Sequence, residues 1–334
     1  MSSLILAYKN FAANKNISHI GLGVSALNTS KVLSRRGIDV EVWPVNKASD
    51  LASRLNERAA THVVISAPWM PSSDLQTLLT TFPATRFAVN CHSNVGFLQA
   101  DSNGVKLVRE GMDLEMGSTR FHVAGNSFKF CQWIKAAYNA PCVYLPNLYH
   151  LESAPTARPA YSSGTLRIGS FGAIRPLKNF MSAAGAALAM ARSLKANLEL
   201  WVSTGRTEGG GDTVMRSIHA MLDGTPGVKL IQAGWQSWPG FRRTAGNMHL
   251  LLQPSYTESF NMVTADGVAE GVPSVVSEAI DWAPDHWKAQ TDDVLDIARV
   301  GRSLLSDAHA VADGYAALTA HNQKGTASWI QFLQ

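Results

Sequence analysis

Short apolar runs alternate with longer amphipathic stretches through the first half of the chain. Apolar runs bounded by turn residues predict strands, and stretches with helical periodicity between them predict helices. The strands predicted in this half cover residues 17–20, 40–43, 62–66, 86–90 and 122–124. Strands of this kind, separated by helices, are typical of a parallel sheet with crossover helices. Residues 1–150 are therefore predicted to form an open α/β domain.

A second α/β series is predicted over residues 165–315. Its strands cover residues 166–170, 198–202, 228–231, 250–253 and 274–277, and its helices cover 181–194, 213–222 and a stretch after Phe260. Residues 151–164 are rich in Ser, Pro and Gly and are predicted to be the linker. Two open α/β sheets in one chain imply two domains that face each other across a crevice. Ligands of such sheets bind at the carboxyl ends of the strands.

Composition narrows the class of protein. Hydrophobic residues make up 46% of the 334 residues and charged residues 16%, which supports a large core and excludes a disordered chain. No apolar run approaches the roughly 18–20 residues of a membrane span, and the start lacks the basic segment of a signal peptide. The three cysteines lack metal-binding spacing, so neither a disulfide scaffold nor a zinc site is expected. These features predict a cytoplasmic protein.

Charge is distributed unevenly along the chain. Residues 1–150 contain 14 Lys and Arg against 9 Asp and Glu, whereas the remaining residues contain 15 against 16. One interpretation is that this difference is random variation in composition. The other is that the first domain binds an anionic partner, such as nucleic acid or a membrane surface.

The most informative stretch covers residues 253–276 and predicts a strand, a Pro-Ser turn, an acidic residue, a helix and a second strand. A helix that begins near Ser259–Asn261 directs free backbone N–H groups and a partial positive charge outward, which suits a diphosphate. A carboxylate just before it, Glu258, can accept hydrogen bonds from sugar hydroxyls. A second carboxylate two turns later, Asp266, can bind a ribose diol. The alternative for Glu258 is an ordinary helix-start acid.

This stretch resembles the signature of retaining GT-B nucleotide-sugar glycosyltransferases, in which two Glu are separated by seven residues. Asp266 stands in place of the second Glu, and Asn261 in place of a Gly. The resemblance implies that Glu258 contacts the donor sugar and Asp266 the ribose. It also implies that the donor contacts Ser259, Phe260, Asn261 and Met262.

Residues 169–179 resemble the loop of that family whose basic pair binds the donor diphosphate. Here the pair is Arg175 and Lys178, and Ala173 stands where the family has its first Arg. Arg supplies a bidentate fork and Lys a mobile point charge, and both suit a leaving group that gains negative charge. The resemblance also places Gly172 at the donor. The alternative is two solvated surface cations.

Weaker signals indicate further site residues. Gly23 lies in a predicted strand-to-helix turn that resembles the family's opening glycine motif, whose amides approach the donor phosphate and the acceptor. The alternative is that such a turn serves helix–strand packing. His92 follows the predicted strand 86–90. The family often has a histidine at a comparable place, and it contacts the transferred sugar or the acceptor. The alternative is a polar residue at a strand end whose hydrogen bonds are made within the protein. Gly234 and Trp235 resemble the family's strand end whose backbone groups contact the nucleotide base.

The resemblance implies an α/β protein of GT-B architecture, with an acceptor domain of residues 1–150 and a donor domain of 165–315. The C-terminal segment, about 316–334, would cross back onto the first domain through Trp329, Ile330 and Phe332. The expected activity is transfer of a hexose, with glucose from UDP-glucose as the first choice, to a hydroxyl of a glycan, lipid or small molecule. No metal, further cofactor or obligate protein partner is expected.

Two alternatives remain open at the level of sequence. A DNA glycosyltransferase acting on a hydroxymethylated base would use the positive charge of residues 1–150 and would associate with DNA. A non-catalytic sugar-nucleotide-binding protein would account for the departures at Asn261 and Asp266.

Overall fold

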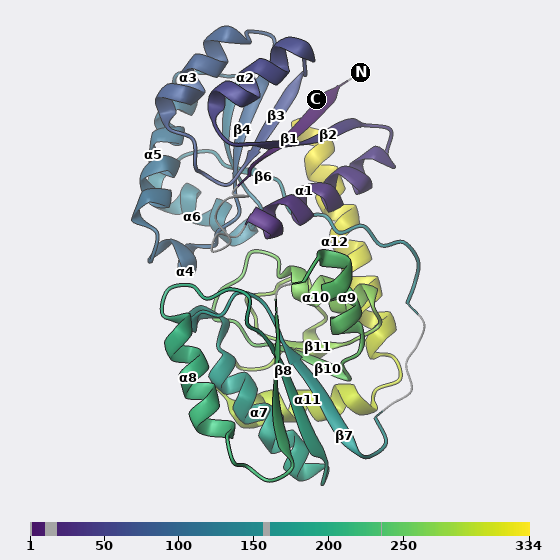
Figure 1. Cartoon of the computed structure of the whole chain (residues 1–334). Coiled ribbons are helices and arrows are strands. Elements are labelled where there is room, and N and C mark those ends of the chain that lie inside the picture. Colours follow the sequence, from purple (N-terminus) through teal and green to yellow (C-terminus); the bar gives the residue numbers. More distant parts are fainter. Residues whose placement is uncertain (1, 11–18, 156–160, 235) are drawn as a thin grey trace. The chain divides into compact units, whose positions relative to one another are not determined.

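The computed structural model describes residues 2–10, 19–155, 161–234 and 236–334. The chain divides into two compact units (Figure 1). The first contains Met1–His150 and His321–Gln334, and the second contains Leu151–Ala320. Each unit has its own parallel sheet and its own core, and each is described separately below.

The first unit contains a six-stranded sheet in the order β2-β1-β3-β4-β5-β6, with every pair parallel. The predicted strands at 40–43, 62–66, 86–90 and 122–124 are confirmed. The strands are β1 (Ser3–Lys9), β2 (Asp39–Val45), β3 (His62–Ser66), β4 (Arg86–Cys91), β5 (Phe121–Gly125) and β6 (Val143–Tyr144). The helices are α1 (His19–Ser34), α2 (Ala48–Glu57), α3 (Ser72–Thr81), α4 (Val95–Leu98), α5 (Ser102–Met116) and α6 (Phe128–Tyr138).

The first strand differs from the prediction. It covers Ser3–Lys9 instead of residues 17–20, of which 17 and 18 lie outside the described residues while 19 and 20 belong to α1. The reason is burial: β1 pairs with both β2 and β3, and its residues 4–7 are at most 2% exposed. The predicted strand-to-helix turn at Gly23 is therefore wrong, because Gly23 lies inside α1.

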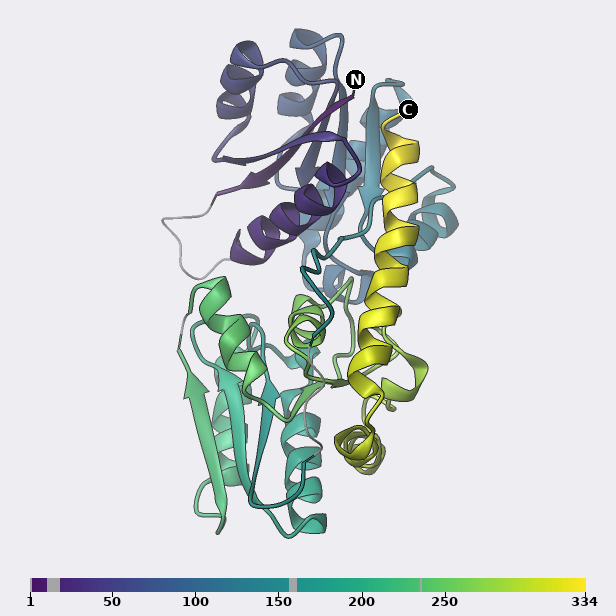
Figure 2. The same cartoon turned by 90° about the vertical axis from the view of Figure 1, so that its right-hand side faces the viewer.

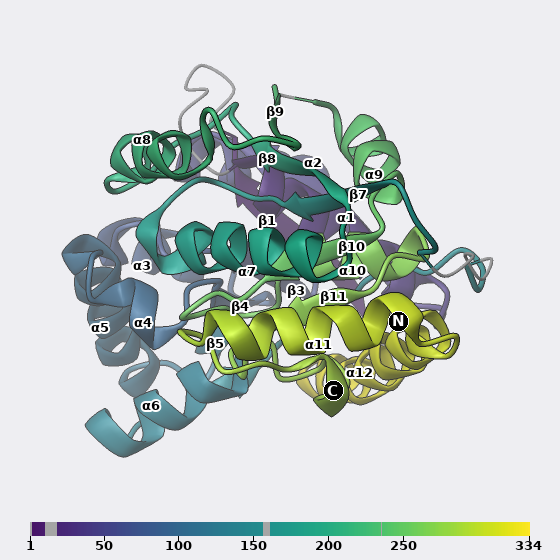
Figure 3. The same ribbon diagram turned by 90° about the horizontal axis from the view of Figure 1, so that it is seen from below.

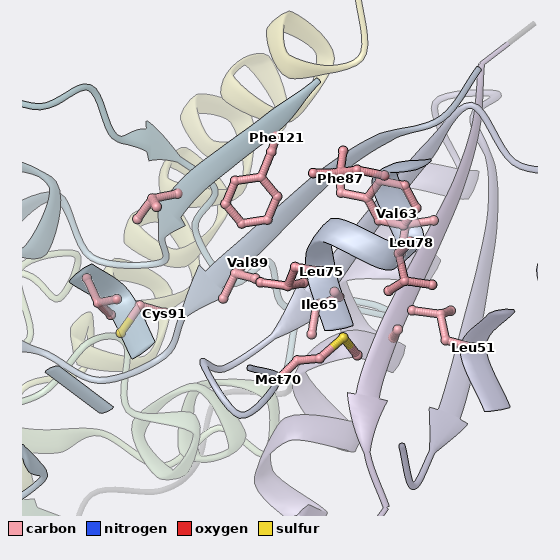
Figure 4. Packing of buried hydrophobic residues seen from close by; sticks show 14 of the residues in the cluster. Leu51, Val63, Ile65, Met70, Leu75, Leu78, Phe87, Val89, Cys91 and Phe121 are labelled. Atoms are coloured by element: carbon pink, nitrogen blue, oxygen red, sulfur yellow. The ribbon is translucent and has the colours of Figure 1, made fainter. Parts of the chain in front are cut away.

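Alternation along the strands divides the first core into two layers. Successive strand side chains point to opposite faces of a sheet, so Ile5 packs on one face while Leu6 packs on the other. The Ile5 face is filled by branched and aromatic residues, including Phe87 and Phe121, and is covered by residues of α2 and α3 (Figure 4). The opposite face contacts α1 and the C-terminal helix.

The C-terminal helix α12 (Ala310–Phe332) contributes its last turns to the first unit (Figure 2). Trp329 is buried, and its indole N–H donates to the carbonyl oxygen of Pro146 at 2.9 Å. Asn322 bonds both backbone groups of Tyr149, at 2.7 and 2.9 Å. Of the three residues expected to supply apolar contact, Trp329 and Phe332 are buried but Ile330 is 38% exposed.

The second unit contains a five-stranded parallel sheet in the order β11-β10-β7-β8-β9. All five predicted strands are confirmed, as β7 (Thr165–Ser170), β8 (Asn197–Ser203), β9 (Val228–Ala233), β10 (Leu250–Gln253) and β11 (Ser274–Val276). The helices are α7 (Phe180–Ser193), α8 (Gly211–Leu222), α9 (Trp238–Gly246), α10 (Met262–Ala269) and α11 (Val294–Ser306), with short 3₁₀ turns η1 (Pro176–Lys178) and η2 (Asp285–Trp287).

Small side chains allow close packing on one face of this second sheet. Helices α7 and α11 lie side by side there (Figure 3), and α7 carries a run of buried alanines at 183, 184, 186 and 187. Gly301 of α11 faces Met190 of α7, because a Cβ at Gly301 would lie only 2.4 Å from the Met190 sulfur. Within the described residues, no helix has both the length and the apolar character that crossing a membrane requires.

The contact of α12 with the first unit yields a test. Gly325 faces Leu148 and Pro146, whose nearest carbons would lie 2.6 and 2.8 Å from an added Cβ. Replacing Gly by Ala inside a helix ordinarily stabilises by about 1 kcal/mol, but overpacking costs about 1–3 kcal/mol. We expect Gly325→Ala to lower the free energy of unfolding in urea by about 1–2 kcal/mol. Gln323→Ala, at an exposed position of the same helix, should be close to neutral; a stabilising Gly325→Ala would contradict this packing.

Candidate functional site

Charged residues gather at the carboxyl edge of the second sheet. Because β7, β8 and β10 are parallel neighbours or near neighbours, the loops that follow them emerge at the same edge. The loop after β7 carries two cations, the loop after β8 a cation and an acid, and the loop after β10 an acid. These residues are Arg175, Lys178, Arg206, Glu208 and Glu258.

The backbone of the loop after β7 places Lys178. Gly172 has a φ of +119°, in a region that side-chain-bearing residues rarely adopt, and the position of its missing Cβ lies 3.6 Å from Cε of Lys178. The next turn ends at Asn179, whose amide donates to the carbonyl oxygen of Pro254 at 3.1 Å. This bond joins the loop after β7 to the loop after β10.

Lys178 and Glu258 form a buried ion pair. Their side chains are 12% and 8% exposed, and Nζ of Lys178 bonds Oε1 of Glu258. Burial by itself would raise the pKa of the Glu258 carboxyl, but Lys178 and Arg175 outweigh burial and hold that pKa below its usual value. Burial lowers the pKa of Lys178, and Glu258 offsets part of that shift. The Glu258 carboxyl is therefore a carboxylate at neutral pH.

Glu208 bridges two arginines at the same edge. Its Oε2 accepts from Nη1 of Arg175 at 3.0 Å, and its Oε1 pairs with Nη2 of Arg206. Backbone bonds between Ile174 and the 206–208 segment, at 3.0 and 2.8 Å, hold the two loops together. Burial, and then Arg175, lower the pKa of Arg206 to about 10. Burial lowers the pKa of Arg175 as well.

Sequence reasoning missed Arg206 and Glu208. The available signal was their position immediately after predicted strand 198–202, at the edge where ligands of α/β sheets bind. A lone basic residue and a lone acidic residue in a loop carry no spacing pattern, so only the fold brings them to Arg175.

Asn261 adopts a left-handed conformation at the start of α10. Its φ is +65°, and its side-chain oxygen accepts from the backbone N–H of Thr264 at 2.9 Å, as a helix N-cap does. Its amide donates to Gln253 at 3.1 Å and to Glu258 at 3.0 Å. This geometry explains the departure from the family's Gly, because Asn is the side-chain-bearing residue that best tolerates positive φ.

Asp266 lies on α10 and is 2% exposed. One of its carboxylate oxygens accepts from the indole N–H of Trp238 at 2.9 Å. Trp238 opens α9 and was not predicted as part of the site, since no local pattern links it to Asp266. The contact of Asp266 with a ribose stays a prediction.

The remaining residues predicted on the second unit have different surroundings. Phe260 is buried, stacks on Trp282 with ring centroids 5.5 Å apart, and accepts a hydrogen bond from that indole at its carbonyl oxygen. Its side chain therefore supports the loop from within. Ser259 and Met262 are half-buried beside it. Gly234 is exposed after β9, and Trp235 lies outside the described residues.

The first unit holds the other two predicted residues, Gly23 and His92. His92 follows β4, and its Nδ1 accepts from the amide of Asn126, which follows β5, at 3.3 Å. Burial lowers the pKa of His92 to about 4, so its ring is neutral at pH 7. The Cβ position of Gly23 lies 3.1 Å from the ring of Tyr8, which means that the glycine lets α1 approach the end of β1.

One group in the described part of the chain has metal-ligand chemistry. The ligand atoms of His286, Asp307 and Asp313 lie within 4.8 Å of one another, at η2, after α11 and in α12. The group is exposed to half-exposed, and the imidazole already lies 3.4 Å from the Asp313 carboxylate. Contacts of the imidazole with the carboxylates of Asp307 and Asp313 account for this arrangement.

The buried ion pair makes a directional prediction. The cluster holds three cations and two carboxylates, so Glu258→Gln leaves three cations against one acid, whereas Lys178→Met leaves two against two. Breaking a buried pair costs about 3–5 kcal/mol, and we expect Glu258→Gln to lose more stability than Lys178→Met. Chemical denaturation of the two variants and their double mutant measures this. Lys106→Met, which breaks an exposed pair with Glu110, should cost less than about 1 kcal/mol; equal losses in all three single variants would contradict the analysis.

The left-handed Asn261 makes a second prediction. Asn261→Gly keeps the backbone conformation but loses the cap and the amide bonds, and should cost about 1–2 kcal/mol. Asn261→Ala also takes on the left-handed penalty of about 1–2 kcal/mol. Alanine should therefore be the more destabilising of the two in thermal or urea unfolding. The reverse order would show that the positive φ carries no strain.

Comparisons with known proteins rest on structure, because no protein-family model and no curated protein sequence matches the chain. Sucrose-phosphate synthase from Thermosynechococcus elongatus matches with a TM-score of 0.67 at 12% identity, covering 98% of each chain. The UDP-forming α,α-trehalose-phosphate synthase from Burkholderia xenovorans matches with a TM-score of 0.66 at 11% identity, covering 100% of each chain.

Two further similar structures contain UDP. HepE from Anabaena, in complex with UDP, matches with a TM-score of 0.63 at 12% identity, covering 99% of this chain and 98% of that one. TarM from S. aureus, in complex with UDP, matches with a TM-score of 0.62 at 11% identity over 86% of this chain, which spans only 59% of TarM. The matches are to retaining GT-B glycosyltransferases. They establish the fold: two Rossmann-like α/β domains in the GT-B arrangement of elements.

Proposed function

We propose that the protein is a retaining glycosyltransferase that moves a hexose from a nucleoside diphosphate sugar to an acceptor hydroxyl. UDP-glucose is the first choice of donor. The observation that carries this proposal is the buried Lys178–Glu258 pair, with Arg175 beside it, at the start of α10. The GT-B fold of similar enzymes, two of which were solved with UDP, supports it.

The basic residues would receive the donor diphosphate. Lys178 and Arg175 would neutralise the charge that develops on the diphosphate as its bond to the sugar breaks. The backbone N–H groups at the start of the eight-residue helix α10 add partial positive charge at the same edge. In this role the cations act on the leaving group, and no metal ion is needed.

The acidic residues would orient the sugar and the nucleoside. Glu258 would accept hydrogen bonds from hydroxyls of the transferred hexose, and Lys178 and Asn261 hold its carboxylate in place. Asp266 would bind the ribose, and the hydrogen bond from Trp238 orients its carboxylate. Phe260, Ser259, Met262, Gly172 and Gly234 would shape the donor site through their backbone.

The first unit would receive the acceptor. His92, neutral at pH 7, would donate a hydrogen bond through Nε2 to a sugar or acceptor hydroxyl while Asn126 fixes its tautomer at Nδ1. Gly23, which lies in α1, would approach the donor phosphate from this unit. We assign the acceptor hydroxyl to a glycan, a lipid or a small molecule.

Turnover of UDP-glucose tests the proposal. We expect Glu258→Ala to reduce donor hydrolysis and transfer by about 100-fold or more, because a buried polar contact to the reacting sugar is lost. Glu278→Ala removes a carboxylate of the same unit that is 80% exposed, and should leave the rate unchanged. Activity should persist in EDTA, and the product should keep the anomeric configuration of the donor by NMR.

The acceptor panel should include oligosaccharides, lipids, small alcohols and duplex DNA with hydroxymethylated bases. Tight UDP binding without transfer to any acceptor would favour a non-catalytic sugar-nucleotide-binding protein. Transfer to the DNA alone would favour the DNA-modifying alternative. Loss of all activity in EDTA would overturn the metal-free mechanism.

A further inference from the structure

Positive charge exceeds negative charge within the cluster of Arg175, Lys178, Arg206, Glu208 and Glu258. The side chains are 21%, 12%, 10%, 21% and 8% exposed, in that order. Like charges this close and this shielded from water repel more strongly than they would at the surface. A cluster with one excess cation is therefore suited to receive an anion.

Arg206 has unused hydrogen-bonding capacity within the cluster. Its side chain is nine-tenths buried, and among the described residues no group accepts from its Nε, which is shielded from solvent. Leaving a buried donor unpaired costs the full desolvation of that group. The neighbouring Nη2 pairs with Glu208. The Nε–Nη2 edge, which binds carboxylates and phosphates with two parallel bonds, is thus half-used.

Glu208 holds both arginines through its two carboxylate oxygens. A carboxylate with two acceptor oxygens resembles one edge of a phosphate in shape and charge. The backbone bonds between Ile174 and the 206–208 segment hold the backbone of Arg206 beside that of Arg175, and they do not involve the side chain of Glu208. The guanidinium groups would therefore keep their positions if another anion replaced this carboxylate.

We propose that Arg206 is a third diphosphate-binding residue of the donor site, and that Glu208 is the counter-ion that occupies the two arginines until the donor arrives. The inference rests on the proposed function, since it assigns the anion to the donor diphosphate. On binding, phosphate oxygens take the Nε–Nη2 edge of Arg206 and the Nη1 of Arg175, and Glu208 is displaced from both. Burial lowers the pKa of both Arg175 and Arg206, which means that their charged forms are less stable in the ligand-free protein than in water.

Calorimetric titration with UDP, UMP and uridine tests the assignment. We expect Arg206→Gln to weaken UDP binding by about 10- to 100-fold and to leave uridine binding unchanged. Arg206→Lys should recover part of the affinity, because a point charge replaces the fork. The matched control is Arg216→Gln, which removes an exposed cation of α8 that donates to Thr213 and should not change binding.

Glu208→Gln has the opposite expected sign. Removing the competing carboxylate should tighten UDP binding by about 10-fold, while the melting temperature of the ligand-free protein falls because two buried guanidinium groups lose their shared counter-ion. A merely structural ion pair would instead lose both stability and affinity. This pair of readouts remains decisive if Arg206→Gln fails to fold.

The outcomes separate this inference from the proposed function. Wild-type protein that binds UDP, with Arg206→Gln or Arg206→Lys binding it equally well, overturns the role of Arg206 alone. Weaker UDP binding by Glu208→Gln overturns the role of Glu208. If wild-type protein binds no UDP, the proposed function fails. Titration with inorganic pyrophosphate then tests the anion site by itself. Pyrophosphate binding that is lost in Arg206→Gln supports the anion site, and no pyrophosphate binding by the wild-type protein overturns it.

Discussion

The ion pair between Lys178 and Glu258 is the interaction on which the second unit's loops depend. It joins residues 80 positions apart, one from the loop after β7 and one from the loop after β10. Burying two charges costs several kcal/mol unless further hydrogen bonds satisfy them. Asn261 supplies one such bond to Glu258, and Gln253 holds Asn261 in turn. The geometry of this sheet edge and the stability of its loops are therefore produced by the same set of contacts.

Parallel topology explains why so few residues suffice to build this edge. A parallel sheet brings the ends of β7, β8 and β10 together whatever the length of the connecting helices. Each loop then needs only one or two side chains and a backbone device: a positive φ at Gly172, a turn at Asn179, a left-handed cap at Asn261. These backbone conformations orient the side chains, and the parallel sheet brings the loops close together.

The fold was largely predictable because buried strands leave a strong local signal. The apolar runs at His62–Ser66 and Leu250–Gln253 correspond to β3 and β10. The first strand was misplaced because two apolar runs, at 3–9 and 17–20, compete near the start, and only pairing with β2 and β3 selects between them. The two-residue β6 is too short to show an alternation of polar and apolar residues, and it is defined by its pairing with β5.

Residues of the candidate site were predictable only where they lie in one continuous sequence motif. Glu258 and Lys178 stand in patterned loops, and the structure brings them into contact. Two other contacts of the candidate site join residues that no single motif contains: Glu208 reaches Arg175 across 33 residues, and Trp238 reaches Asp266 across 28. Such contacts depend on loop closure in three dimensions, and composition in a single loop does not encode them.

The charge balance of the cluster links stability to binding. A fully neutralised cluster would make the ligand-free protein more stable, but a donor diphosphate would then have to displace well-paired counter-ions and would gain little. A cluster with an excess cation is less stable when empty, and gains more when an anion enters, because repulsion among the cations is relieved in the same step. Sites of this kind trade stability of the free protein for affinity. Under the proposed function, the excess positive charge around Arg206 is a property of the ligand-free protein that a bound diphosphate would neutralise.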